Sequence, residues 1–307
     1  MKRHALGKRV MQHWQLYVFL ILPVCYVLVF KYYPMLGAQI AFKEFNIAKG
    51  IWGSEWIGFD HFERFIKGYQ FKRVIKNTIV LSLYSILATF PFPIIFALGV
   101  NVMRKPRIKK FVQTLTYMPH FISTVVLVGM MMQMFHPTVG VYGTISRALT
   151  GATPKDLFSN VNAFPHLYVW SAVWQGFGYN SIIYLAALTS VSEETHEAAQ
   201  IDGASRFQRV IHVDIPAILP TIIIMLILRM GHVMNLGFEK VYLMQNTLNL
   251  RVSEVISTFV YKQGLAAGAS SDYSYATAID LFNAVINLVL IVSVNAVSRR
   301  VSDTSLW

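Results

Sequence analysis

Few side chains in this 307-residue sequence have the types and spacings that enzymes use for chemistry. His196 is followed at once by Glu197, which is how one zinc-protease motif begins, but the second histidine of that motif is missing. The sequence has no G-x-x-x-x-G-K-[ST] loop to hold nucleotide phosphates. It shows no evident pair of glycosidase carboxylates, and its histidines do not cluster like metal ligands. We therefore predict a non-catalytic chain with no metal site and no cofactor of its own.

The composition indicates a protein whose main solvent is lipid. Hydrophobic residues make up 55% of the chain and charged residues 14%, whereas a soluble domain carries about a quarter charged residues. The mean hydropathy is +0.48. The net charge of +12 does not indicate a nucleic-acid partner, because the basic residues flank apolar stretches instead of forming a basic soluble face. The single cysteine, Cys25, excludes an internal disulfide.

The elements that must position any functional residue are six apolar stretches. Each is close to the length of about 20 residues that crosses about 30 Å of hydrocarbon. Lipid accepts only helices or closed barrels, and these stretches are far longer than barrel strands. We therefore predict an all-α polytopic membrane protein, with Pro91 and Pro93 kinking the second span. The predicted spans are Leu16–Phe30, Thr78–Met103, Phe111–Phe135, Phe164–Thr189, Ala217–Leu236 and Tyr275–Val297.

The connections predict the orientation of the chain. Basic residues cluster before the first span, between the second and third spans and after the last span, and six spans place these three segments on one side. Positive charge marks that side as cytoplasmic, so both termini are predicted to be cytoplasmic. The predicted organisation is a basic cytoplasmic segment 1–15 and a membrane domain 16–307, with an extracytoplasmic segment 31–77 and a cytoplasmic loop 190–216. The basic residues are Lys2, Arg3, Lys8, Arg9, Arg104, Lys105, Arg107, Lys109, Lys110, Arg299 and Arg300.

Several polar residues fall inside the predicted spans, where such groups are costly and usually face a partner or a wet cavity. Three of them share one helical face of the sixth span. We predict that they line a substrate path. Three alternatives remain: Arg229 and Asp280 pair with each other, they hold two membrane chains together, or the asparagines join neighbouring helices. The candidate path residues are Trp174, Gln175, Tyr179, Asn180, Arg229, Asp280, Asn283 and Asn287.

The connection between the fourth and fifth spans, from Ser190 to Pro220, is too patterned for a simple loop. Ser190 and Glu193 have the spacing of a capping box, which predicts that a helix begins there. Gly203 can end that helix by adopting a positive φ. The first half of this connection therefore predicts a short exposed helix that ends at a glycine corner.

The second half of the connection predicts another short helix. Ser205 and Gln208 form a second capping-box pattern, so a helix is expected from about Arg206 to His212. Pro216 then separates this helix from the fifth span. Two short helices joined by a corner would make a rigid element that protrudes from the membrane.

At these residues the chain resembles the family of inner-membrane permeases of binding-protein-dependent ATP-binding-cassette (ABC) importers. In that family the loop forms a coupling helix that sits in a groove of a separate ATP-hydrolysing subunit. The resemblance implies a type I importer permease with six spans, and implies that the matching residues transmit force rather than perform chemistry. Val213 and Ile215 stand where the family usually has isoleucine and leucine. The residues assigned to coupling by this resemblance are Glu197, Ala198, Ala199, Asp202, Gly203, Ala204, Ile215 and Pro216.

The first 60 residues resemble a narrower branch of that family, the oligo- and polysaccharide permeases, which includes alginate-type and LplB-like members. The resemblance rests on Trp14–Tyr17, Phe30–Met35, Gln39–Lys43 and Trp52–Gly58. It implies carbohydrate cargo and a location in the bacterial cytoplasmic (inner) membrane. It also implies four partners, namely an extracytoplasmic solute-binding protein, a second and different permease chain, and two ATP-binding subunits that bind MgATP.

Carbohydrate cargo would give the candidate path residues a direct chemical use. Amides and carboxylates hydrogen-bond to sugar hydroxyl groups, and aromatic faces stack on sugar rings. If Arg229 faces the path unpaired, it favours an anionic sugar such as a uronate, as in alginate.

Two other functions remain open at the level of the sequence. An ion-driven secondary transporter would show internal repeats and interrupted half-helices with an ion site near the midplane of the membrane. A membrane-embedded sugar transferase would need a polar catalytic cluster at one membrane face. Neither pattern is clear in this sequence.

Overall fold

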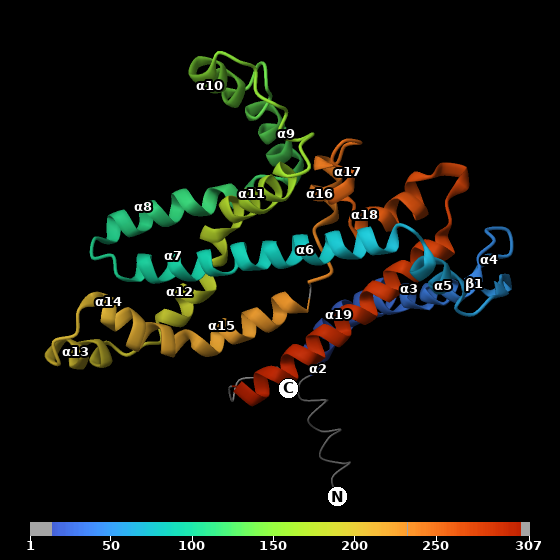
Figure 1. Ribbon diagram of the computed structural model, residues 1–307. Coiled ribbons are helices and arrows are strands. Elements are labelled where there is room, and N and C mark those ends of the chain that lie inside the picture. Colours follow the sequence, from blue (N-terminus) through green and yellow to red (C-terminus); the bar gives the residue numbers. More distant parts are fainter. Residues whose placement is uncertain (1–13, 232, 302–307) are drawn as a thin grey trace, which may run out of the picture. The chain divides into compact units, whose positions relative to one another are not determined.

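The computed structural model describes residues 14–231 and 233–301, and it is almost entirely helical (Figure 1). The chain divides into two compact units. The first comprises residues up to 66 together with 263–281, and the second comprises 67–262 together with the residues from 282 onward. The basic residues Lys2, Arg3, Lys8 and Arg9 of the predicted N-terminal segment lie outside the described residues.

The first unit begins with a long helical run that extends beyond the predicted first span. The run is continuous from Trp14 to Phe42, a length of 29 residues, whereas the sequence predicted a helix ending near Phe30. It extends further because the turns after Phe30 become π and 3₁₀ turns rather than a loop. Its consecutive elements are α2 (Trp14–Val27), η1 (Leu28–Tyr32), α3 (Tyr33–Met35) and η2 (Leu36–Phe42).

A small two-stranded sheet and a short helix follow this run. Strand β1 (Lys43–Glu44) pairs antiparallel with β2 (Glu55–Trp56), with α4 (Gly50–Gly53) between them. Helix α5 (Asp60–Lys67) is amphipathic, and its Phe65 is buried. The Phe42 ring contacts Trp56, Phe59 and Phe62. The unit is completed by η5 (Lys262–Ala266), η6 (Gly268–Ser270) and the first turns of α19 (Tyr273–Val301).

The second unit contains the helices that carry most of the candidate residues. Their order in the chain is α6 (Phe71–Thr89), α7 (Pro91–Asn101), α8 (Pro106–Tyr117), η3 (Met118–Phe121), α9 (Thr124–Met134), α10 (Val141–Thr150), α11 (Ala163–Asn180), α12 (Ile182–Leu188), α13 (Glu193–Ile201), α14 (Arg206–Arg209), η4 (Val210–Asp214), α15 (Ile215–Met230), α16 (Phe238–Met244), α17 (Leu250–Ser253), α18 (Ile256–Tyr261) and the remainder of α19. Helix α11 packs along α6, α7 and α8, so it is a central element of this unit.

Among the described residues, four helices are long and apolar enough to cross a membrane. They are Trp14–Phe42, Phe71–Asn101, Arg206–Met230 and Tyr273–Val297, and they overlap the predicted first, second, fifth and sixth spans. The third predicted span is not one straight helix, because α8 with η3 and α9 meet at an angle of 97°. Pro119 and Ser123 lie at this break, where Ser123 caps the new helix. The fourth predicted span is divided between α11 and α12 and is not among the four.

The second and fifth spans each contain a proline at the start of a helix, Pro91 and Pro216. In the second span, α6 ends at Thr89 and α7 begins at Pro91, with only Phe90 between them, so the helix runs from Phe71 to Asn101 and the predicted kink stays a prediction. Pro216 does not separate two helices, so that prediction is wrong. The helix instead continues from Arg206 to Met230 through the π turn η4, in which Ile215 N bonds to Val210 O. The wider turn accommodates a proline at the start of α15.

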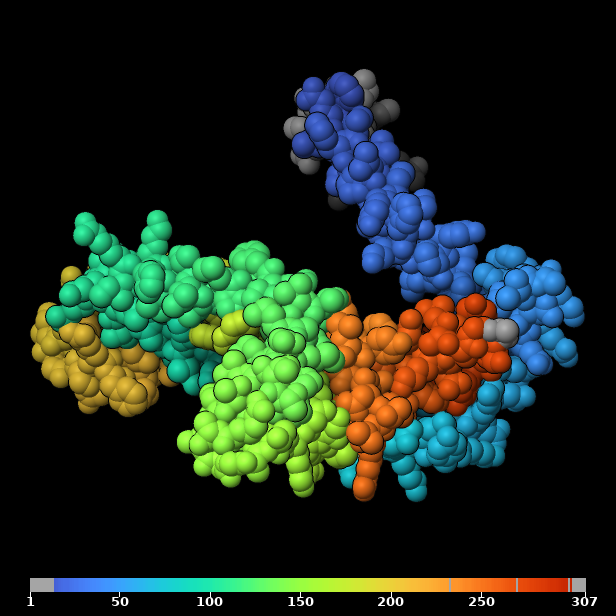
Figure 2. All heavy atoms as spheres, turned by 90° about the horizontal axis from the view of Figure 1, so that it is seen from above, coloured from blue at the N-terminus to red at the C-terminus, as the bar shows by residue number. Residues whose placement is uncertain are grey.

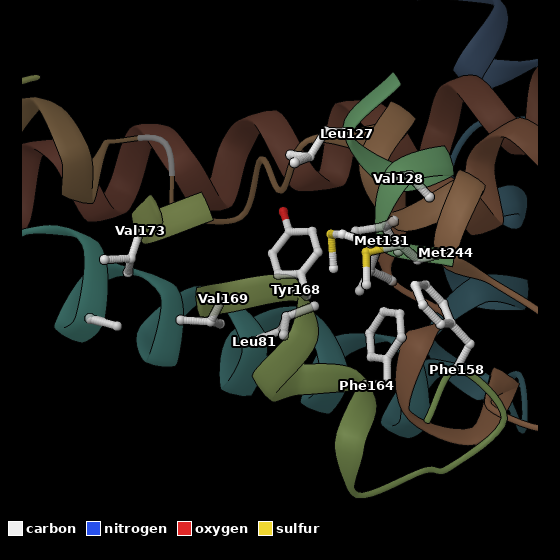
Figure 3. Packing of buried hydrophobic residues seen from close by; sticks show 13 residues of the cluster. Leu81, Leu127, Val128, Met131, Phe158, Phe164, Tyr168, Val169, Val173 and Met244 are labelled. Carbon is white, nitrogen blue, oxygen red and sulfur yellow. The ribbon is translucent and has the colours of Figure 1, made fainter. Parts of the chain in front are cut away.

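The core of the second unit lies where α6, α9, α11 and α16 meet (Figure 3). Phe164, Tyr168 and Val169 of α11 fill this core, with Met131 of α9 and Met244 of α16 packed against them. Figure 3 shows the two methionine sulfur atoms beside the rings of Tyr168 and Phe164. A second cluster joins α7, α12 and α15 around Ala97, Tyr184 and Ile218. The second cluster therefore holds α12 and α15, the helices on either side of the connection 190–214.

Candidate functional site

The patterned connection after α12 forms the first predicted short helix, whereas the second is the beginning of a helix that continues to Met230. Helix α13 spans Glu193–Ile201, and α14 spans Arg206–Arg209. The predicted start at Ser190 is wrong by two residues, because Ser192 is the N-cap and its side chain accepts a hydrogen bond from Glu194 N at 3.2 Å. The Ser190 hydroxyl instead donates to Ala187 O at the end of α12.

Gly203 forms the corner between these helices. Its φ of +81° lies in the left-handed region, which favours glycine because a Cβ atom is strained there. Gly203 N bonds to Gln200 O at 3.0 Å and Ala204 N bonds to Ala199 O at 2.9 Å, which together make a Schellman motif. The coupling candidates Ala199, Gly203 and Ala204 therefore build the corner with their backbone, and Asp202 is the C-cap.

The second helix begins with the predicted capping box. Gln208 N donates to Ser205 Oγ at 3.3 Å, and Ser205 N donates to Gln208 Oε1 at 2.7 Å. Because α14 leads without a break into η4 and α15, this box fixes the beginning of a helix that reaches Met230. Ile215 and Pro216 are the first residues of α15.

The surface of this segment presents apolar side chains to solvent. Ile201 is 87% exposed and Phe207 is 73% exposed, on either side of the glycine corner. Glu197 and Ala198 are also exposed, whereas Ala199 and Ala204 are half-buried. Figure 2 shows the segment as gold spheres at one end of the second unit, beside the teal residues near 100. Large apolar side chains on a protruding, rigidly capped corner are typical of a contact surface for another protein.

Sequence reasoning missed a buried polar contact behind this corner. The Asp214 carboxylate is 2% exposed, and its Oδ1 lies 3.3 Å from Nε2 of His196 on α13. Both residues line a cavity of about 640 Å³ between α13, α14 and the end of α7. The sequence did offer one signal for this contact, because Asp214 is an acidic residue among mostly apolar residues just before Pro216.

The candidates on α11 divide between an aromatic stack and structural contacts. Tyr179 stacks on His120 of η3, with ring centroids 3.8 Å apart and an interplanar angle of 3°, and Phe121 packs edge-on against it. Gln175 Nε2 donates to Ile122 O at 2.8 Å, so it satisfies a carbonyl at the break of the third span. Trp174 is exposed and Asn180 is half-buried. Sequence reasoning did not single out His120 or Phe121.

The asparagines of the sixth span bond to the segment that follows α15. Asn283 Nδ2 and Asn287 Nδ2 both donate to Asn235 Oδ1, at 2.9 and 3.2 Å, and Met234 N donates to Asn287 Oδ1 at 3.1 Å. Both side chains are buried, so their geometry favours the alternative of joining helices. Asp280 is exposed on the same helix, and Arg229 is half-buried near the end of α15. That Arg229 and Asp280 line a path stays a prediction.

Comparison with protein families gives a match over most of the chain. Residues 73–303 match the model of the family described as "Binding-protein-dependent transport system inner membrane component". The matched range contains the whole segment 190–216 and all of the candidate path residues.

Two characterised sequences and one solved structure are similar along the whole chain. The sequence is 41% identical to Protein LplB of Bacillus subtilis over 95% of this chain and 91% of that protein. It is 38% identical to the polygalacturonan/rhamnogalacturonan transport system permease protein YteP of Bacillus subtilis, over 100% of this chain and 94% of that protein. A chain of a bacterial ABC transporter involved in the import of the acidic polysaccharide alginate superposes with a TM-score of 0.88 at 36% identity, over 97% of this chain and 99% of that chain.

Proposed function

The chain belongs to the family of binding-protein-dependent transport system inner membrane components, and from this premise we propose how it works as a permease subunit of an ATP-driven carbohydrate importer. It is a transport subunit rather than an enzyme. It crosses the bacterial cytoplasmic membrane six times with both termini in the cytoplasm. It pairs with a second, homologous permease chain, and two ATP-binding subunits that hold MgATP supply the energy.

The observation that carries this mechanism is the corner at Gly203. Two capped helices present Ile201 and Phe207 to solvent, and the second helix continues as one body into α15. Movement of a partner seated on this corner is therefore passed to a membrane span without a flexible joint. Glu197 to Ala204, with Ile215 and Pro216, serve coupling in this way. Closure of the ATP-binding subunits draws the corners together and opens the path outward.

The cargo is a carbohydrate, and we assign it to the acidic oligo- and polysaccharides. The names of the relatives support this class, since one is a polygalacturonan/rhamnogalacturonan permease and the similar solved transporter imports alginate. An extracytoplasmic solute-binding protein delivers such a polymer, as in the alginate transporter solved with a pentasaccharide-bound periplasmic protein. The basic side chain of Arg229, half-buried in a predicted span, suits a uronate carboxylate.

The path runs past the break in the third span. Irregular backbone at membrane depth is tolerated where it lines a cavity or is buried in protein. At this break, Tyr179, His120 and Phe121 offer stacked aromatic faces, and such faces bind the apolar side of a sugar ring. Trp174, Asn180 and Arg229 complete the proposed path, while Gln175, Asn283 and Asn287 hold its walls.

The test is ATP hydrolysis by the assembled complex in proteoliposomes, with its binding protein and a panel of neutral and uronate oligosaccharides. We expect stimulation by uronates and loss of that stimulation in Glu197→Lys. Glu194→Lys is the matched control, because it reverses a charge on the same exposed helix outside the coupling residues. A chain that captures no ATPase, and that no sugar stimulates, contradicts the proposal.

A further inference from the structure

The segment 190–214 contains one buried residue, and that residue is charged. Asp214 is 2% exposed, while every other residue from Ser190 to Val213 is exposed or half-buried. A buried carboxylate costs free energy unless it is paired, and removing its partner leaves the charge uncompensated. His196 Nε2 lies 3.3 Å from its Oδ1, Arg209 and Asn101 at the end of α7 also act on this carboxylate, and Oδ1 makes no hydrogen bond among the described residues.

The position of His196 on α13 determines which face of that helix is presented outward. His196 and Ala199 are the half-buried residues of the helix, one turn apart, whereas Glu194, Glu197 and Ile201 are exposed. Residues three apart lie on the same side of a helix, so His196 and Ala199 mark its inner side. The Schellman motif at Gly203 fixes the end of α13, but it does not fix the rotation of the helix about its own axis. The contact from His196 to Asp214 does.

From this geometry we infer that His196 and Asp214 form a tether that positions the coupling helix, α13, against the N-terminal end of α15. The inference rests on the proposed function, because it concerns how the same corner is held while force passes through it. His196 and Asp214 are positioning residues: neither touches sugar or nucleotide, and both act through the orientation of Glu197 and Ile201. The tether also joins α13 directly to the body that continues into the membrane.

The tether lies at the edge of a cavity and not in a sealed core. His196 is 23% exposed and lines the cavity beside Asp214. The charged and titratable groups that line this cavity are Arg104, Glu193, His196, Glu197, Arg206, Arg209 and Asp214.

The experiment measures ATP hydrolysed per sugar transported by the assembled complex in proteoliposomes. His196→Phe keeps a ring but removes the polar contact with Asp214, so it should raise the ratio about fivefold. His196→Gln keeps a side chain that can donate to the carboxylate, so it should give a lower ratio than His196→Phe.

A matched control and a double variant separate the tether from a general loss of structure. His212 lies on the same segment, where its Nδ1 contacts Gln208 O and its side chain is exposed, so His212→Gln should keep the wild-type ratio. Asp214→Asn removes the charge that His196 faces and should raise the ratio. His196→Phe combined with Asp214→Asn should be no worse than the worse single variant, because the two residues share one interaction.

The outcomes distinguish this inference from the proposed function. If Glu197→Lys uncouples the complex while the His196 and Asp214 variants keep the wild-type ratio, the tether is wrong and the coupling assignment stands. If Glu197→Lys leaves the ratio unchanged as well, the coupling assignment itself fails. Because His196 is partly exposed, its variants are expected to assemble even if Asp214→Asn does not, and wild-type behaviour of both His196 variants alone overturns the tether.

Discussion

Two connections of the second unit, 190–214 and 238–262, are both built from short helices but are held in place differently. In the connection 190–214, the helices are fixed mainly by their own caps: Ser192 and Ser205 at the beginnings and Gly203 at the corner. Asp214 is its one buried residue. Its structure is therefore local, and its outer surface is free for a partner.

The connection 238–262 is instead locked to the surrounding helices by buried polar groups. Asn249 is 0% exposed and donates to Phe158 O at 2.8 Å and to Met244 O at 2.9 Å, while its Oδ1 accepts from Ser253 Oγ and Asn246 N. Ile256 N donates to Thr78 Oγ1 on α6. Glu254 is 4% exposed and pairs with Arg73 of α6 and with Lys262.

This difference suits two different mechanical tasks. Elements that move are drawn from regions with few buried contacts, whereas buried hydrogen-bond networks open only with the whole fold. We interpret 190–214 as the element that a partner moves and 238–262 as a fixed support beside α6. Substitutions in the fixed support should reduce stability, and substitutions in the moved element should reduce coupling.

The largest expected effect is a loss of stability when a buried polar residue of the fixed support is removed. Asn249→Ala leaves the carbonyl groups of Phe158 and Met244 without this donor and the Ser253 hydroxyl without this acceptor. We expect the free energy of unfolding to fall by about 3 kcal/mol. Thermal unfolding of the purified chain in detergent, followed by tryptophan fluorescence, measures this change. The matched control is Gln200→Ala on α13, whose exposed amide bonds only to His196 O; equal shifts in the two variants would contradict the comparison.

The next largest effect is a gain of stability when Lys240, in the same fixed support, is replaced by an apolar residue. Lys240 is 8% exposed, burial lowers its pKa from 10.5 to about 8, and its Nζ makes no hydrogen bond among the described residues. The pKa shift corresponds to a burial cost of about 3 kcal/mol at pH 7, which the Tyr168 ring 5.2 Å away offsets by about 1 kcal/mol. We expect Lys240→Met to be more stable by about 2 kcal/mol at pH 7.

The pH dependence of that variant gives a second check with a definite sign. Between about pH 8 and pH 10.5 the unfolded chain keeps the Lys240 proton that the folded chain has lost, so wild-type stability should rise with pH in this window. Lys240→Met should lack this rise, and the two proteins should converge towards its upper end. Parallel curves at all pH values would exclude a buried charged lysine.

Local chemistry predicted the moved element better than the fixed support. The capping box at Ser205 and the glycine corner at Gly203 are set by neighbours within a few residues, so the sequence alone indicates them. Asn249 bonds to Phe158, which is 91 residues away, and no spacing rule predicts such a partner. The same limit explains His196 and Asp214, which only the fold brings together.

The helices were predictable as apolar stretches, but their breaks were not. At the 97° bend in the third span, Gln175 of α11 donates to Ile122 O, whereas the sequence around the break shows only Pro119. The opposite error occurred at Pro216, where a π turn keeps the helix continuous. Asn283 and Asn287 were correctly recognised as polar residues on one face, but the partner that engages them, Asn235, lies on a different segment.

A smaller effect, on sugar transport per ATP, is expected when Gly203 at the corner of the moved element is replaced. Gly203→Val places a Cβ in open space, so the cost is backbone strain of about 1–2 kcal/mol and not a clash. The strain should displace the corner and lower sugar transport per ATP about tenfold, with little change in thermal stability. Gly151→Val is the control: it imposes the same strain at φ +70° at the end of α10, also in open space. If both variants transport equally, strain at the corner has no specific role.

The smallest effect on ATP used per sugar is expected when the N-cap of α14 is removed. Its size tests whether the structure of 190–214 depends only on contacts within that segment. Ser205→Ala removes one exposed cap bond, to Gln208 N, which is worth about 1 kcal/mol or less. Because α14 continues into η4 and α15, the loss should loosen only its first turn, and ATP used per sugar should rise about twofold. Ser123→Ala removes the equivalent cap of α9, from Val126 N, and should leave this ratio unchanged. A larger effect at Ser123 than at Ser205 would mean that coupling passes through the break of the third span, and 190–214 would then no longer be the element that moves.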